Sequence, residues 1–216
     1  MKKVFFILLT ICLYAVAFSQ VQLTEKEKED LIDQIKRKVV IFQDNEANLA
    51  GNIYGFDEKM DIYRGTLRLF IGEGDEYEME TPQGEITTHD PVTLKIFPSK
   101  VSKRKKTYWL KDYLTKRINN STNSDFRYKK VVIETSDVIL IDDIKEQGNG
   151  RFITTAHYMK VEKNSRTGEM NKITYEDRTT RTVKIYIESV QTYGKDGKIE
   201  NRWVILLGDI DCDNVW

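Results

Sequence analysis

The chain has 216 residues and carries 34 basic and 34 acidic side chains, so its formal net charge at pH 7 is zero. A neutral chain lacks the basic surplus that is typical of nucleic-acid-binding domains, and we expect no nucleic-acid partner. The only histidines are His89 and His157 and the only cysteines are Cys12 and Cys212, which excludes a histidine-rich metal site and a disulfide framework. We therefore expect neither a metal ion nor a cofactor.

The N-terminus has the pattern of a secretory signal peptide. Lys2 and Lys3 precede an apolar run that ends in Ala17, Phe18 and Ser19. This basic start, short apolar segment and pair of small residues predict cleavage after Ser19, and the run is too short to be a comfortable membrane span of about 20 residues. We expect residues 1–19 to be removed and residues 20–216 to form one periplasmic or secreted domain with no membrane span.

Cysteine usage fits this interpretation. Lipoprotein cleavage at Cys12 is the alternative to cleavage after Ser19, but the neighbouring Ile11 is bulky at a position where a small residue is needed. After cleavage Cys212 is the single cysteine of the mature chain. We expect it to be a small buried hydrophobic residue rather than a reactive thiol.

Three helices and a short strand are predicted in the first part of the domain. The first helix runs from Thr24, which has capping-box spacing to Glu27, to a stop at Gly51. A second covers residues 57–70 and ends before two glycines, and a third covers residues 108–118, with Trp109 and Tyr113 stacked at i, i+4. Residues 92–97 form a short strand between the second and third helices.

The rest of the chain predicts an antiparallel β-meander. Long segments rich in β-branched and aromatic residues cover 126–141, 151–163, 173–193 and 199–212. The connections between them are rich in Gly, Asn and Asp, as hairpin turns require. Strands of a dozen or more residues imply a strongly twisted and curved sheet, with the helices packed on one side.

Three motifs add a resemblance to this pattern. The strings LFIGEGDEYE, YEDRTTRTVKIYI and WVILLGDI resemble a group of secreted bacterial proteins of unknown function with the nuclear-transport-factor-two-like/cystatin-like fold. The resemblance implies an α+β cone in which N-terminal helices pack on a long, strongly curved antiparallel meander. Such cones include isomerases, dehydratases, ligand-binding modules and assembly domains, so the resemblance leaves function open.

The best candidate site lies in the predicted strand 173–193. Alternation puts Tyr175, Asp177 and Arg181 on one face, where the acid and the guanidinium could hold a polar ligand between them. Asp177 is also the weak candidate for a general base, and we expect His157 and Trp203 to be walls of the same pocket. The structural alternative is a bulge that turns the face outward and leaves these side chains as solvated charges.

Two charged segments are weaker candidates. Asp209, Asp211 and Asp213 alternate near the C-terminus like the start of a calcium loop, but no downstream glutamate completes it, and a solvated acidic edge is the alternative. Residues 100–106, KVSKRKK, form the only basic run, which is either an anion-binding patch or a solvated loop.

These observations favour an exported, non-catalytic ligand-binding or protein-interaction module of the bacterial cell envelope. Its partner would be a small polar or amphipathic ligand or another envelope protein, and a homodimer is consistent with the second case. The alternative is a small cone-fold enzyme of the isomerase or dehydratase type that uses Asp177 as its general base.

Overall fold

The computed structural model describes residues 23–81, 83–97, 104–122, 130–135, 139–167, 172–193 and 198–215, and the predicted signal peptide lies outside them. Within these ranges the protein is α+β, with three α-helices, a large mixed sheet and a separate hairpin. The helices are α2 (Glu25–Ala50), α3 (Phe56–Leu67) and α4 (Leu110–Thr122), with a short 3-10 turn, η1 (Ile71–Gly74). The hairpin strands are β1 (Tyr77–Glu80) and β2 (Ile86–His89). The sheet strands are β3 (Thr93–Ile96), β4 (Lys106–Trp109), β5 (Lys130–Thr135), β6 (Leu140–Ile141), β7 (Lys145–Gly148), β8 (Arg151–Thr167), β9 (Lys172–Tyr193) and β10 (Ile199–Val215).

The first predicted helix is confirmed in detail. The Thr24 hydroxyl accepts a hydrogen bond from the backbone N–H of Glu27, whose carboxylate accepts one in return from the backbone N–H of Thr24. This capping box starts α2, and Gly51 ends it by donating its N–H to the Ala47 carbonyl at 2.8 Å. Among the described residues, no helix combines the length and apolar character that crossing a membrane requires.

The other two helices have different bounds from those predicted. Helix α3 ends at Leu67 rather than at residue 70, because Phe70 forms a parallel bridge with Leu207 of β10 and is fully buried. Helix α4 starts at Leu110, because Trp109 belongs to β4, which pairs with β3. The predicted stacking of Trp109 on Tyr113 is therefore wrong. At Trp109, strand pairing outweighs the local helical pattern, in keeping with the preference of aromatic residues for β-strands.

The sheet confirms the meander and corrects its first strand. The strand order is β4-β3-β10-β9-β8-β5, and all pairs are antiparallel except β10 with β3, which is parallel. The predicted strand 126–141 is instead two separate strands, β5 and β6, which each pair with β8. Strand β7 also pairs with β8. The β8–β9 ladder runs without a register shift, whereas the pairing of β10 with β9 shifts between Leu207 and Ile210 and again between Cys212 and Asn214.

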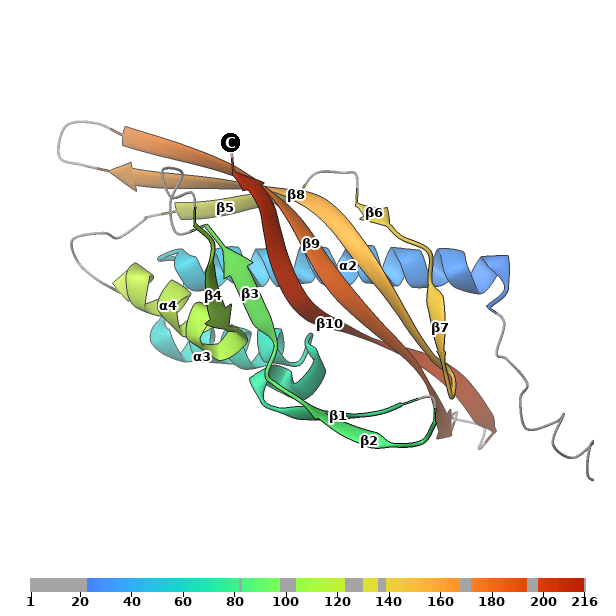
Figure 1. Cartoon of the computed structure of the whole chain (residues 1–216). Coiled ribbons are helices and arrows are strands. Elements are labelled where there is room, and N and C mark those ends of the chain that lie inside the picture. The colour runs from blue at the N-terminus through green and yellow to red at the C-terminus, as the bar shows by residue number, and fades with distance from the viewer. Residues whose placement is uncertain are drawn as a thin grey trace, which may run out of the picture.

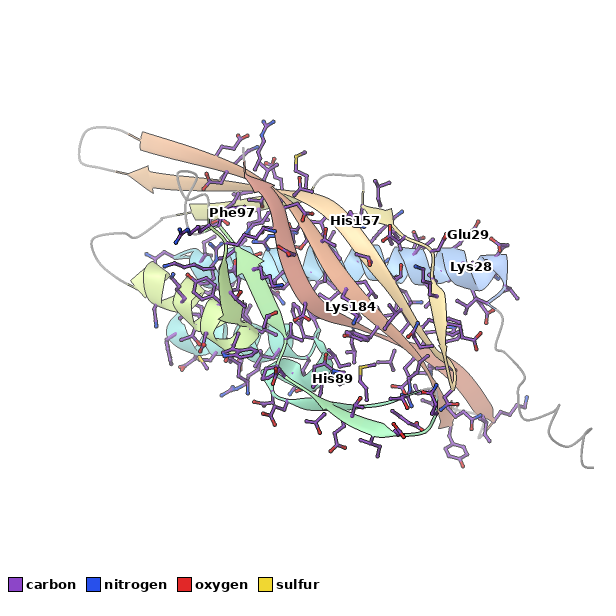
Figure 2. All side chains as sticks on the ribbon, in the orientation of Figure 1. Lys28, Glu29, His89, Phe97, His157 and Lys184 are labelled. Carbon is purple, nitrogen blue, oxygen red and sulfur yellow. The ribbon has the colours of Figure 1, made fainter. Side chains whose placement is uncertain are left out.

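The two faces of the sheet have different surroundings. The inner face packs against α2, and α2 runs behind the sheet along its length in Figure 1. Residues Val183, Ile185 and Ile187 of β9 contribute to the core on this side, and Cys212 is buried as predicted. The outer face, toward the viewer, carries the alternate residues of each strand, including the labelled His157 and Lys184 (Figure 2).

The β1–β2 hairpin is an element that the sequence pattern did not predict. Its strands pair from Tyr77 opposite His89 to Glu80 opposite Ile86. It passes along the lower side of the sheet in Figure 1, toward the β7–β8 turn. Arg151 at the start of β8 binds Glu80 there, with its Nη1 on the Glu80 carbonyl at 2.5 Å and its Nη2 on the carboxylate at 2.5 Å. The hairpin is thus fastened to the sheet at its far end.

Candidate functional site

The structure divides the predicted site residues between the two faces. Arg181 is buried on the inner face, and the continuous β8–β9 ladder excludes a bulge that would turn it outward. Trp203 pairs with Ser189, eight residues from Arg181, or roughly 26 Å along the strand, and packs edge-to-face on Phe152. His157 lies on the outer face. The structure therefore does not bring these three side chains together.

The other two predicted residues lie toward the opposite end of β9. Asp177 is half-buried and pairs in register with Glu162, roughly 13 Å along the strand from Arg181. Tyr175 is part of β9, but its side chain lies outside the described part of the structure. A catalytic role for Asp177 stays a prediction.

Arg181 belongs instead to a buried ion cluster made by Glu46, Arg117, Lys160, Glu162 and Arg181. Glu46 on α2 is its centre and is completely buried. Arg181 binds both carboxylate oxygens of Glu46, with Nη1 at 3.0 Å and Nη2 at 3.3 Å, and the Lys160 ammonium lies 2.6 Å from Oε1. Lys160 also contacts Glu162 at 2.7 Å, and Glu162 binds Arg117 of α4 at 2.9 Å. The cluster therefore joins α2, α4, β8 and β9.

Electrostatics in this cluster favour the charged forms of its carboxyl groups. Burial by itself acts to raise the pKa of Glu46, but Arg181, Lys160 and Arg117 outweigh it and lower that pKa to about 2. Burial acts on Glu162 in the same sense, and Arg117 and Lys160 hold its pKa well below the ordinary value. Tyr113, which donates its hydroxyl to Glu46, has a raised pKa because of burial and the Glu46 charge.

The cluster is an internal network of charges that bind one another. Arg181 and Lys160 direct their charges at Glu46, so neither is offered to a ligand. The sequence did hold a signal for this network. Glu46 falls on the buried stripe of α2 that includes Phe42 and Leu49, and alternation along β8 puts Lys160 on the face of the buried Tyr158.

A second polar network lies on the outer face around His157. One ring nitrogen, Nδ1, lies 3.1 Å from the Thr182 hydroxyl, and the other, Nε2, lies 3.2 Å from the Asp142 carboxylate. Thr182 in turn donates its hydroxyl to Asp213 at 2.8 Å. The Thr182 proton is thus directed at a carboxylate rather than at the imidazole, which differs from the arrangement of an activated nucleophile.

A feature with the character of a binding site is a cavity of about 500 Å³ between the β1–β2 hairpin and the outer face of the sheet, here called the hairpin cavity. Its volume falls within the range of sites for small molecules. Most of its exposed wall is apolar, and its apolar lining includes Met79 and Ile86 of the hairpin and Ile153, Val204 and Leu206 of the sheet.

The hairpin cavity has two polar ends. At the hairpin base, called the donor end, lie Thr87, His89, Lys184 and Tyr186. Here the Lys184 Nζ lies over the Tyr186 ring, 4.9 Å from the ring centroid. His89 stacks on Tyr77 with ring centroids 5.2 Å apart, and the Tyr77 and Tyr186 hydroxyls are 3.4 Å apart. Figure 2 labels His89 near the hairpin base and Lys184 on the sheet above it.

At the hairpin tip, called the clamp end, the charges are paired. Arg151 binds Glu80 of the hairpin and also approaches Glu188 of β9, with Nε 3.4 Å from Oε1. One guanidinium therefore holds two carboxylates of the cavity wall.

A smaller cavity of about 290 Å³ adjoins the first one. The two share Ile153 and Lys184 in their walls, and the smaller one is otherwise lined mainly by threonine hydroxyls, Lys95 and the carboxylates of Asp209 and Asp211. Asp209 accepts hydrogen bonds from the N–H and hydroxyl of Thr93, and Asp211 pairs with Lys105 at 2.5 Å. The alternating aspartates near the C-terminus thus bind different partners, with Asp213 on Thr182.

Neither cavity is lined by Asp177, Arg181 or His157. Of the basic run 100–106, residues 100–103 lie outside the described part of the structure. No known protein-family model matches the chain, and a comparison with curated proteins also finds no match.

Proposed function

We propose that this protein is an exported, non-catalytic binding protein that holds a small amphipathic ligand in the hairpin cavity. The observation that carries the proposal is the cavity itself: about 500 Å³, mostly apolar walls and a few polar groups gathered at its ends. Sites for small molecules commonly combine an apolar lining with a small number of placed polar groups that fix orientation. The proposal places the ligand on the outer face, away from the buried ion cluster.

Export and the cone fold belong to the same proposal. The basic and apolar start of the chain supports cleavage after Ser19 and a periplasmic or secreted location. The long helix α2 across one face of a curved meander supports the nuclear-transport-factor-two-like/cystatin-like architecture. N-terminal sequencing of the exported protein should begin at Gln20, and a mature protein that begins elsewhere would contradict the cleavage site.

The binding proposal is tested with Nile red, a neutral dye whose fluorescence rises in apolar surroundings. The protein purified after export should bind the dye, and dodecanol should displace it. Val204→Trp fills the cavity wall and should abolish binding. Leu140→Trp is the matched control, because Leu140 is an exposed aliphatic residue of β6 that does not line the hairpin cavity, and it should leave binding unchanged. Equal binding by both variants would refute the proposed site.

A further inference from the structure

We infer that the ligand of the hairpin cavity is a single-chain anionic amphiphile, with its anionic head at Lys184 and its apolar chain between the hairpin and β10. This inference rests on the proposed binding function and adds the chemical class and orientation of the ligand. It follows from how charge is distributed along the cavity, which differs between the two ends.

Lys184 is the cation at the donor end. Its side chain is exposed and lines both cavities, and it forms no ion pair with any carboxylate in the described part of the chain. Its ammonium lies over the Tyr186 ring, 4.9 Å from the ring centroid. An ammonium group that faces a cavity without a counter-ion is suited to binding a carboxylate or phosphate oxygen.

Other hydrogen-bond donors surround Lys184. The Tyr186 hydroxyl lies beside that of Tyr77, and two hydroxyls so close can each donate only one proton, so one of them can be directed at a ligand oxygen. His89 uses Nε2 to contact the Thr87 hydroxyl at 3.0 Å and lines the same end of the cavity. This end therefore offers several groups that favour an acceptor-rich head.

Several acidic groups near the cavity are held by partners of their own. Glu80 and Glu188 are both held by Arg151 at the clamp end, and Glu78 is exposed on the hairpin strand. Asp209 of the smaller cavity accepts two hydrogen bonds from Thr93, and burial together with the Asp209 charge raises the pKa of Tyr186 at the donor end. An anionic head at the clamp end would meet two carboxylates that already share one guanidinium, whereas at the donor end it would meet the Lys184 ammonium, which forms no ion pair with a described carboxylate.

The chain of the amphiphile is accommodated by the apolar middle of the hairpin cavity. Met79 and Ile86 come from the hairpin, and Ile153, Val204 and Leu206 come from three positions on the sheet. Ile86 is 69% exposed, so a chain seated here would remove apolar surface from water. The smaller cavity, with Lys95 on its wall, leaves room for a larger head group beyond Lys184.

The test compares three ligands that share one chain and differ in head charge: dodecanoate, dodecanol and dodecyltrimethylammonium. The affinity of each ligand is measured by displacement of Nile red from the wild-type protein and from the variants Lys184→Glu and Lys184→Met. We expect dodecanoate to bind about tenfold more tightly than dodecanol to the wild type, as one charge-assisted hydrogen bond provides. Both variants should lose that preference and keep the affinity for dodecanol within about twofold.

Lys26→Glu is the matched control, because Lys26 is an exposed lysine on α2, behind the opposite face of the sheet. It makes the same change in net charge as Lys184→Glu and should leave all three affinities unchanged. If dodecanol binds the wild type as tightly as dodecanoate, or if the ammonium ligand is preferred, the anionic class is refuted while the cavity stands. If neither Nile red nor any of the three ligands binds, the proposed function fails together with this inference.

Discussion

Glu46 is the residue on which the buried ion cluster depends. Its carboxylate faces Arg181 and Lys160, and all three side chains are at least nine-tenths buried. Removing one partner of a buried ion pair typically costs about 3–5 kcal/mol, because the remaining charge has no water around it. We expect Glu46→Gln to lower the free energy of unfolding by that amount in urea titrations monitored by circular dichroism.

A surface pair supplies the control for this substitution. Glu134 binds Lys163 at 2.6 Å, but the two side chains are 53% and 37% exposed. Exposed pairs contribute about 0–1 kcal/mol, so Glu134→Gln should change the free energy of unfolding by no more than that. Similar losses in the two variants would mean that Glu46 is not desolvated in the folded protein.

The same carboxylate predicts a dependence of stability on pH. The Glu46 pKa is lowered from its ordinary value of 4.5 to about 2, so its contribution is fully present above about pH 4.5 and is lost as the pH falls toward 2. We expect the stability difference between wild type and Glu46→Gln to be about 3 kcal/mol near pH 6 and to shrink steadily below pH 4.5. Unfolding titrations at several pH values measure it. A difference that is constant down to pH 2.5 would contradict the lowered pKa.

At the scale of elements, the β1–β2 hairpin is held mainly at its two ends. Arg151 fastens the tip through Glu80, and Tyr77 contacts Tyr186 at the base. Arg151→Ala should therefore let the hairpin open locally without unfolding the sheet. We expect amide hydrogen exchange in residues 77–89 to rise about tenfold, which corresponds to about 1.4 kcal/mol, while exchange in the core of β9 stays the same.

Arg64→Ala is the control for the hairpin experiment. Arg64 forms an exposed pair with Asp61 within α3, and its loss should leave exchange in the hairpin unchanged. If Arg151→Ala also leaves it unchanged, the clamp does not hold the hairpin. If exchange rises through the whole sheet, Arg151 supports the fold rather than the hairpin alone.

The sequence predicted some elements better than others, because some depend on contacts between neighbouring residues and others on contacts between residues far apart in the sequence. Helix α2 was predicted with its cap because the capping box and the apolar stripe are local signals. The start of α4 was not, because Trp109 is drawn into β4 by pairing with Thr93. The hairpin was missed because its strands are short and mostly exposed, with no apolar alternation to mark them.

The predicted site residues do not all lie together, for a reason that concerns the whole molecule. Arg181 lies on the inner face, but its partner Glu46 lies 135 residues away on α2, and no local pattern pairs the two. The hairpin cavity forms only when a local hairpin folds over the outer face of strands that come much later in the chain. A sequence pattern can show which residues share a face of a strand, but it does not show what covers that face.

The whole molecule thus separates a face that stabilises the fold from a face that we propose binds the ligand. The buried ion cluster lies between the sheet and α2, whereas Lys184 lies on the outer face beside the hairpin. Substitutions at distant sites with no shared partners usually have additive effects, within about 0.5 kcal/mol. We expect the unfolding free energy of Glu46→Gln/Lys184→Met to equal the sum of the single effects, nearly all of it from Glu46→Gln.

Ligand affinity should depend on Lys184 and not on Glu46, the reverse of the dependence expected for stability. Glu46→Gln should keep the wild-type affinity for dodecanoate at neutral pH, where it remains folded, while Lys184→Met should lose about tenfold without losing stability. Chemical unfolding with and without dodecanoate measures both quantities on the same samples, since a ligand at about 100 times its Kd adds about 2.7 kcal/mol to the folded state. Loss of dodecanoate affinity in folded Glu46→Gln would show that the inner cluster shapes the cavity through the sheet, and the two faces would then act as one unit.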